Sequence, residues 1–264
     1  MTRPRRERVP AALGLLAGLG AAFFILPLAG LLARAPWGDA LTALSAPETL
    51  EALRLSLVAS LTATAVSLLL GVPLAWVYAR VEFPGRNLLR ALTTLPMVLP
   101  PVVGGIALLL AFGRRGLLGM LLERGFGITL PFTTAGVVMA ETFVSMPFLV
   151  LTVEAGLRSL DSRYEEAART LGAGRWTVLG RVTLPLIAPS LFAGAVLSWA
   201  RALGEFGATI TFAGNFPGRT QTMPLAVYLL LESRPEASFI LSLVLLAVSL
   251  AVLVGLRDRW LGSP

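Results

Sequence analysis

The sequence predicts an all-α integral membrane protein with about six transmembrane helices. Hydrophobic residues make up 56% of the chain, charged residues make up 14%, and the mean hydropathy is +0.79. Soluble domains contain about 25% charged residues. The apolar residues also form runs of the roughly 20 residues that a helix needs to span a membrane, whereas strands of a membrane barrel need only about 10.

Six apolar segments are expected to span the membrane within a single transmembrane domain, residues 1–264. They cover residues 10–33, 53–79, 88–112, 132–157, 184–212 and 239–256. The first follows four arginines and ends in an Ala-x-Ala sequence, as a signal peptide does, but its apolar run exceeds the roughly 7–15 residues of a signal peptide, so we expect a retained helix. In the third segment, Pro100 and Pro101 followed by Gly104 and Gly105 predict a kink or a break.

The distribution of arginine predicts the topology. All 22 basic residues are arginine. If the N-terminus lies inside the cell, the cytoplasmic segments hold 14 arginines and the outer loops hold 6, while Arg54 and Arg201 lie in or beside membrane segments. Because cytoplasmic loops are enriched in Lys and Arg, both termini are expected inside, in a multi-pass protein of the inner membrane. The same count places residues 158–181 in the cytoplasm.

The composition excludes several classes of site. The chain has no cysteine and no histidine, which rules out disulfides, thiolate or imidazole metal ligands, and Ser-His-Asp catalysis. Without lysine it cannot form the G-x4-G-K-[ST] loop that binds ATP phosphates. The net charge of +7 is spread over the loops, so we expect no nucleic-acid binding. We therefore expect no catalytic site, no metal and no bound cofactor in this chain.

The cytoplasmic loop at residues 158–181 is predicted to contain a short helix. Asp161 or Ser162 can cap its start, and acidic residues in its first turns favour the helix dipole. Gly172 and Gly174 are expected to end it. A short helix of this kind can bind in a groove of a partner protein, although an ordinary solvated loop is the alternative interpretation.

The residues of this loop carry a resemblance to a known family. Glu166-Ala167-Ala168 and Gly172, followed after nine residues by Val182-x-Leu184-Pro185, form the pattern E-A-A-x3-G-x9-V-x-L-P. This pattern resembles the cytoplasmic signature of ABC importer permeases, with Val182 replacing the commoner Ile. The resemblance implies the type I ABC importer permease fold and a helix that docks on an ATPase subunit, which alone uses ATP and Mg. The residues it assigns to ATPase coupling are Glu165, Glu166, Ala167, Ala168, Gly172, Leu184 and Pro185.

The fifth apolar segment contains an unusual charged pair. Arg201 and Glu205 stand at i and i+4, and either charge at the bilayer centre costs about 2.5–3.5 kcal/mol. Two interpretations remain open, an intrahelical pair that fixes packing and a pair at the translocation pathway or its outer gate. The depth of the pair also stays open, since counting from Pro185 or from Pro189 gives different positions. The candidate pathway residues are Arg201, Gly204, Glu205, Gly207, Thr209, Thr211 and Asn215.

The segment GEFGATITFAGNFPGRTQTMP, residues 204–224, looks like the corresponding region of molybdate permeases in the molybdate, tungstate and sulfate branch of ABC importers. The resemblance implies a homodimer in membrane lipid, two ABC ATPase subunits and an extracytoplasmic oxyanion-binding protein. Thr, Asn and Gln side chains could donate hydrogen bonds to a tetrahedral oxyanion, and Arg201 or Arg219 could attract its charge. A sulfate or thiosulfate permease is the first alternative.

Two further classes of function are alternatives. One is an ion-coupled transporter or channel without an ATPase, in which Glu141, Glu154 and Glu205 would be proton or cation sites. The other is a membrane-embedded enzyme or scaffold. Neither requires the signature around Glu166, so that loop discriminates between the hypotheses.

Overall fold

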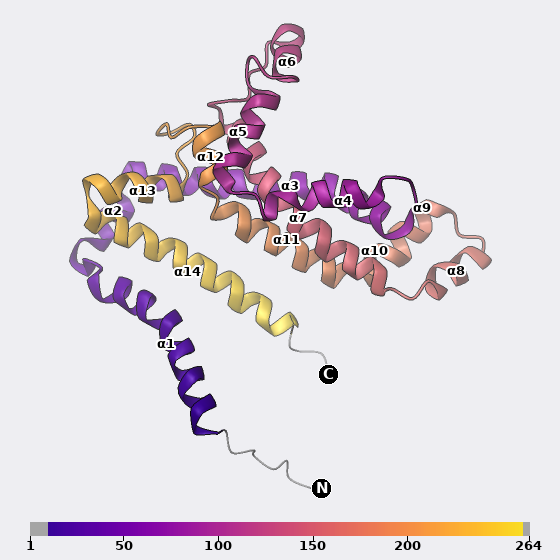
Figure 1. Ribbon diagram of the computed structural model, residues 1–264, viewed down its shortest axis with the longest axis horizontal. Helices are drawn as coiled ribbons and strands as arrows, with labels where there is room; N and C mark the ends of the chain where they lie inside the picture. Colours follow the sequence, from indigo (N-terminus) through magenta and orange to yellow (C-terminus); the bar gives the residue numbers. More distant parts are fainter. Residues whose placement is uncertain (1–9, 261–264) are drawn as a thin grey trace.

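The computed structural model describes residues 10–260, and this part of the chain consists of helices and the loops that join them (Figure 1). The α-helices are α1 (Ala11–Arg34), α2 (Ala40–Ser45), α3 (Pro47–Arg80), α4 (Arg86–Thr94), α5 (Pro101–Phe112), α6 (Gly119–Phe126), α7 (Thr134–Ser159), α8 (Arg163–Thr170), α9 (Arg175–Val178), α10 (Leu184–Leu186), α11 (Ala188–Leu203), α12 (Gly207–Phe212), α13 (Met223–Ser233) and α14 (Pro235–Trp260). Short 3-10 helices cover Trp37–Asp39 and Leu95–Met97, and a π-helix covers Leu179–Thr183. The all-α prediction is confirmed for the described residues.

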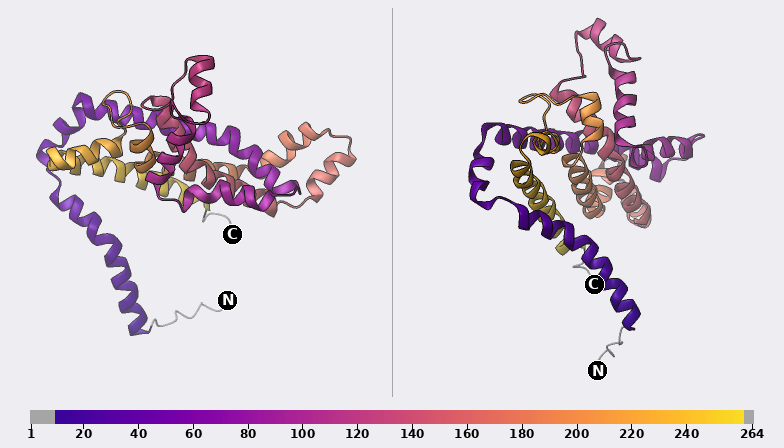
Figure 2. Two further views of the ribbon diagram at one scale, coloured as in Figure 1. Left: turned by 45° about the horizontal axis from the view of Figure 1, so that its top comes forward. Right: turned by 60° about the vertical axis from the view of Figure 1, so that its left-hand side comes forward.

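Helices α3, α7 and α11 lie side by side and form the core (Figures 1 and 2). Small residues bring them together: a Cβ at Gly71 of α3 would lie 2.9 Å from Leu149 Cδ2 of α7. Close contacts through small residues are typical of helices packed inside membranes. Near the end of α3 the apolar core is completed by Tyr78, Val153, Leu157 and other buried side chains.

The predicted spans are confirmed in outline and differ in detail. Within residues 10–260, α1, α3 and α7 are each long and apolar enough to cross a membrane. The third predicted span breaks where Pro100 and Pro101 stand, and its halves Arg86–Met97 and Pro101–Phe112 diverge by 119°, because proline at these positions cannot continue the helical hydrogen bonds.

The fifth predicted span, residues 184–212, is not one continuous helix. Helices Arg175–Leu186 and Ala188–Leu203 meet at an angle of 70°, and α11 then ends at Gly204, so that α12 is a separate helix. Pro189 lies at the start of α11, where a missing N–H costs least. The sixth predicted span, residues 239–256, lies within α14.

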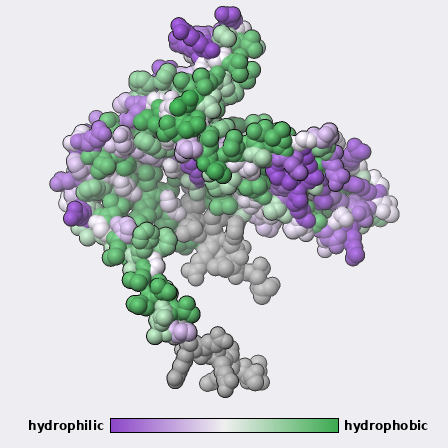
Figure 3. Space-filling model, viewed as in Figure 1, coloured by the Kyte–Doolittle hydropathy of each residue, from purple (hydrophilic) through white to green (hydrophobic). Residues whose placement is uncertain are grey.

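Two elements stand away from the core. Helix α1 leaves the bundle at the lower left of Figure 1, and α6 projects at the top, as both views of Figure 2 also show. All of α1 is described, and it buries no residue. Figure 3 shows that hydrophobic residues cover much of the body, whereas hydrophilic residues gather at the end that carries α4, α8 and α9. By the arginine count this polar end is the cytoplasmic one, and we refer to it as the inner end.

Candidate functional site

The predicted cytoplasmic helix is present as α8. Asp161 Oδ1 accepts a hydrogen bond from the Arg163 backbone N–H at 2.9 Å, which satisfies one of the free donors at the start of the helix. Gly172 follows the end of α8 with a φ of 85°, a left-handed conformation that glycine adopts without strain. The sequence therefore predicted both ends of this helix correctly.

The outer face of α8 and the turn after it are uncovered. Glu166 and Ala167 are exposed, and Ala168 is half-buried. Leu171 is 89% exposed and Trp176, in α9, is 85% exposed. An apolar surface of this kind at the polar end of the molecule is typical of an interaction site.

Glu165 points the other way, into the protein. It is 7% exposed, and its Oε1 lies 3.3 Å from Arg80 Nη2 at the end of α3. The same oxygen accepts a hydrogen bond from Thr183 Oγ1 at 2.7 Å. Sequence reasoning assigned a role to Glu165 but missed Arg80 and Thr183. Leu184 is half-buried against the apolar core, while Pro185 is exposed in α10.

The charged pair predicted in the fifth segment is confirmed. Arg201 Nη2 lies 2.5 Å from Glu205 Oε2, and the Arg201 side chain is 28% exposed while that of Glu205 is 1% exposed. Glu205 Oε1 also accepts a hydrogen bond from the Ala208 backbone N–H at 2.9 Å. Glu205 therefore joins two helices, because it follows the break at Gly204 and caps the start of α12.

Helix α12 packs closely against α5. A Cβ at Gly207 would lie 2.8 Å from Pro101 Cβ, so only glycine fits there without a shift. Thr211 is half-buried, and its hydroxyl donates to the Gly207 carbonyl at 2.8 Å. Among the described residues, the buried side-chain oxygens of Thr209, Asn215 and Thr222 have no hydrogen-bond partner. These groups therefore have unused hydrogen-bonding capacity.

The other acidic residues in the membrane segments have different surroundings. Glu154 is paired with Arg90 and Arg158 at the inner end of α7. Glu141 is buried in the middle of α7, and its Oε2 has no hydrogen-bond partner in the part of the chain that the structure describes. Residues 10–260 contain no group of three or more acidic side chains that could hold a metal ion.

Residues 67–262 match the family described as "Binding-protein-dependent transport system inner membrane component". The chain belongs to this family and is a multi-pass protein of the inner membrane, which confirms the predicted family and location.

Relatives refine this assignment. The chain is 46% identical over 256 residues to the molybdenum transport system permease protein ModB of Mycobacterium bovis, covering 97% of this chain and 94% of the relative. It is 39% identical over 238 residues to the sulfate transport system permease protein CysT of Escherichia coli, covering 88% and 85%. Among solved structures, a chain of a bacterial alginate ABC transporter in complex with its periplasmic protein has a TM-score of 0.72 at 18% identity, covering 94% and 93%, which confirms the permease fold.

Proposed function

We propose that this chain is the transmembrane subunit of an ATP-driven importer for a tetrahedral oxyanion, molybdate or tungstate. The observation that carries the proposal is the exposed helix α8, which combines uncovered apolar residues with a sharply defined end at Gly172. A transporter that worked without a cytoplasmic partner would have no need of such a surface.

The substrate class follows from the relatives. The 46% identity to a molybdenum transport permease over nearly the whole chain favours molybdate, with tungstate as its chemical analogue. The 39% identity to a sulfate transport permease makes sulfate the second candidate. All of these anions are tetrahedral, so the residues that line the pathway need hydroxyl, amide and guanidinium donors in either case.

The remaining subunits of the importer would be an ATPase and an extracytoplasmic binding protein. In this arrangement the α8 of each of two copies of the chain, with Glu166 and Ala167 outward, docks in a groove of one of two ABC ATPase subunits. The ATPase supplies the ATP and Mg chemistry, for which this chain has neither lysine nor histidine. The binding protein delivers the oxyanion from the outer side.

A second copy of the chain completes the pathway in this proposal. Helix α1 buries none of its own residues, and Phe23, Phe24 and Leu26 are among its exposed apolar side chains. These residues suit contact with lipid or with a second copy. Cross-linking in membranes without substrate should trap a homodimer, and a strictly monomeric chain that transports would contradict this part of the proposal.

The pathway lies beside α12. Arg201 attracts the anion, while Glu205 at 2.5 Å reduces the positive charge so that the anion can be released. The free hydroxyl of Thr209 can then donate a hydrogen bond to one of its oxygens, and the NH2 group of Asn215 is a second donor of the right type. Conduction requires binding that is favourable enough for entry and weak enough for exit, which this balance provides.

The proposal is tested by purifying the chain alone and together with a candidate ATPase and oxyanion-binding protein. The pure chain should release no phosphate from ATP above a detergent blank. The complex should hydrolyse ATP faster when the binding protein carries molybdate, and competition with tungstate and sulfate ranks the substrates. ATP hydrolysis by the pure chain would contradict the proposal, and so would the failure of every candidate ATPase to bind.

A further inference from the structure

Helix α8 is linked to the membrane helix α3 through one buried side chain. Within α8, all of which the structure describes, Glu165 is the one buried residue. Its Oε1 contacts both Arg80 of α3 and Thr183 of the π-helix. Helix α8 also lies beside α9 and the π-helix. Among the described residues, Glu165 makes the one ion pair between α8 and α3.

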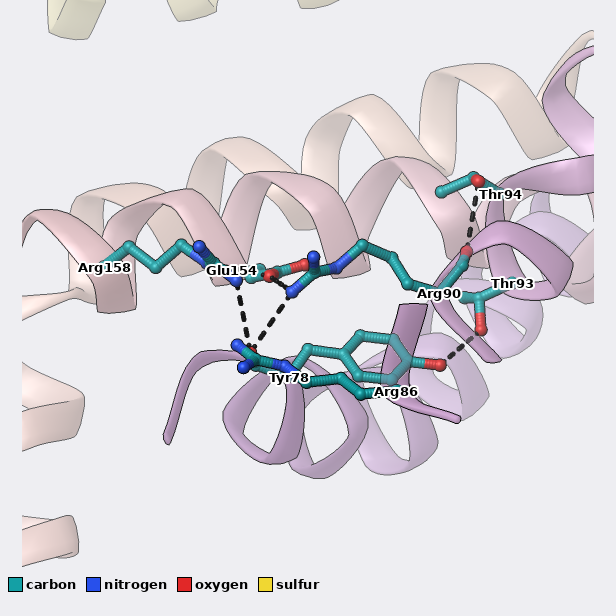
Figure 4. Close-up of polar contacts among 7 residues, drawn as sticks. All are labelled: Tyr78, Arg86, Arg90, Thr93, Thr94, Glu154 and Arg158. Atoms are coloured by element: carbon teal, nitrogen blue, oxygen red, sulfur yellow. Dashed lines mark hydrogen bonds and ion pairs between the residues drawn. The ribbon is translucent and has the colours of Figure 1, made fainter. Parts of the chain in front are cut away.

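The end of α3 that Glu165 reaches is itself clamped to two other helices (Figure 4). The Tyr78 carbonyl oxygen accepts hydrogen bonds from Arg86, from Arg90 at 3.3 Å and from Arg158 at 3.4 Å. Glu154 Oε1 accepts from Arg90 Nη2 at 2.5 Å and from Arg158 Nε at 2.9 Å. We call these five residues the inner polar cluster, and it ties α3, α4 and α7 together.

The charges of the inner polar cluster favour a fixed arrangement of α3, α4 and α7. The carbonyls of the last turn of a helix have no partner within that helix, and the negative end of the helix dipole lies there. Three guanidinium groups satisfy this end of α3, and one carboxylate balances part of their charge. The Arg90 guanidinium also lies 5.6 Å from the centre of the Tyr78 ring, and the Tyr78 hydroxyl lies 2.7 Å from Thr93 Oγ1.

From the inner polar cluster the chain leads to the proposed pathway through two helices that meet at a bend. Helix α4 runs on into the 3-10 helix Leu95–Met97, and α5 follows after the break at Pro100, at an angle of 119°. A Cβ at Gly105 of α5 would lie 2.8 Å from the Ala208 carbonyl oxygen and 2.7 Å from Thr211 Cβ, both in α12. Since α5 and α12 touch at this distance, neither can move far without displacing the other.

We infer that Glu165 and Arg80 are positioning residues that transmit the movement of α8 through the inner polar cluster and the α4–α5 arm to α12. This inference rests on the proposed function, in which an ATPase docks on the exposed face of α8. The inference gives two adjacent residues different roles. Glu166 contributes to the docking surface, whereas Glu165 transmits the movement of the docked helix to the membrane helices.

The test measures transport and hydrolysis in the same assembled transporter. Glu165→Gln and Arg80→Gln are reconstituted in vesicles with the ATPase and the binding protein, and molybdate uptake per ATP hydrolysed is determined. Both variants should keep ATPase binding and hydrolysis, while uptake per ATP falls by about fivefold or more, the range of a typical coupling energy. The ratio does not depend on how much protein folds, so a purely structural role would leave it unchanged.

Controls separate the possible outcomes. Glu82→Gln makes the same chemical change at an exposed residue close to Arg80 and should keep the parental ratio. Arg80→Lys, which keeps the charge, should recover part of the loss, and Thr183→Val serves if Glu165→Gln does not fold. A parental ratio in both Gln variants, or a loss of ATPase binding with an unchanged ratio, would overturn the inference. If the parent itself does not bind an ATPase, the proposed function fails and not only this inference.

Discussion

The inner end and the region around α12 both contain charges in a largely apolar protein, but they satisfy them differently. At the inner end the Glu154 and Glu165 carboxylates each receive two donors, and the Tyr78 carbonyl receives three. Around α12, buried side-chain oxygens such as that of Thr209 have no partner among the described residues. The paired oxygens of the inner end join helices to one another, although the buried Nε atoms of Arg80, Arg86 and Arg90 have no hydrogen-bond partner among the described residues. Around α12 it is hydroxyl and amide oxygens that lack a partner. Under the proposed function, we expect the inner end to transmit movement and the α12 region to contact the solute.

The largest effect on uptake is expected at the docking surface. Glu166→Arg reverses a charge on the exposed face of α8 and should cost about 2 kcal/mol or more of ATPase binding, the size of an interface hot spot. Gly172→Trp should act similarly, because it places bulk at a position with φ of 85°. Pull-down of the ATPase and uptake in membranes measure both effects, with Glu82→Arg as the control for charge. Normal uptake in both variants would contradict the assignment of α8 as the docking helix.

The next largest effect on uptake, and the largest effect on stability, is expected at the pair beside α12. Removing one partner of a buried ion pair leaves an uncompensated charge and costs about 3–5 kcal/mol. Glu205→Gln should therefore lower the melting temperature or trap the anion, and Arg201→Gln should slow uptake. The double variant should recover stability better than transport. If all three variants transport with the kinetics of the parent, the pair is a packing feature.

Much of this arrangement was predictable from local sequence. The signature from Glu166 to Gly172 gave the cytoplasmic helix, and the i, i+4 spacing gave the pair of Arg201 and Glu205. The inner polar cluster was not predictable, because Arg90 and Glu154 are 64 residues apart and meet only in the folded protein. The opposite orientations of Glu165 and Glu166 follow from a rotation of about 100° between consecutive residues of a helix. The sequence alone does not show which face of α8 is directed toward the membrane helices, so it could not predict which of the two glutamates is buried.

A smaller effect is expected where α5 meets α12. Gly105→Ala would place a Cβ 2.7 Å from Thr211 Cβ, and overpacking of this kind costs about 1–3 kcal/mol. Gly125→Ala, where a Cβ meets nothing within 4 Å, is the matched control. Thermal unfolding in detergent should distinguish the two variants. Equal stability would show that α5 and α12 can separate freely.

The smallest effect distinguishes the two regions most sharply. Thr209→Val removes a buried hydroxyl that has no partner among the described residues, so stability should stay the same or rise. Half-maximal uptake should then need about fivefold more molybdate, for a lost hydrogen bond of about 1 kcal/mol. Thr183→Val, which loses the 2.7 Å bond to Glu165, should instead lower stability. The reverse order of stabilities would contradict the comparison.

The most direct test of the proposed function is molybdate uptake into vesicles that contain the purified chain, the ATPase and the oxyanion-binding protein. Uptake should require ATP on the side of the vesicle membrane where the ATPase is bound, and it should depend on the binding protein. Tungstate should inhibit it more strongly than sulfate. It should disappear with Glu166→Arg. Uptake that continues without ATP, or that follows an imposed proton or sodium gradient, would show that the chain is not the membrane subunit of an ATP-driven importer.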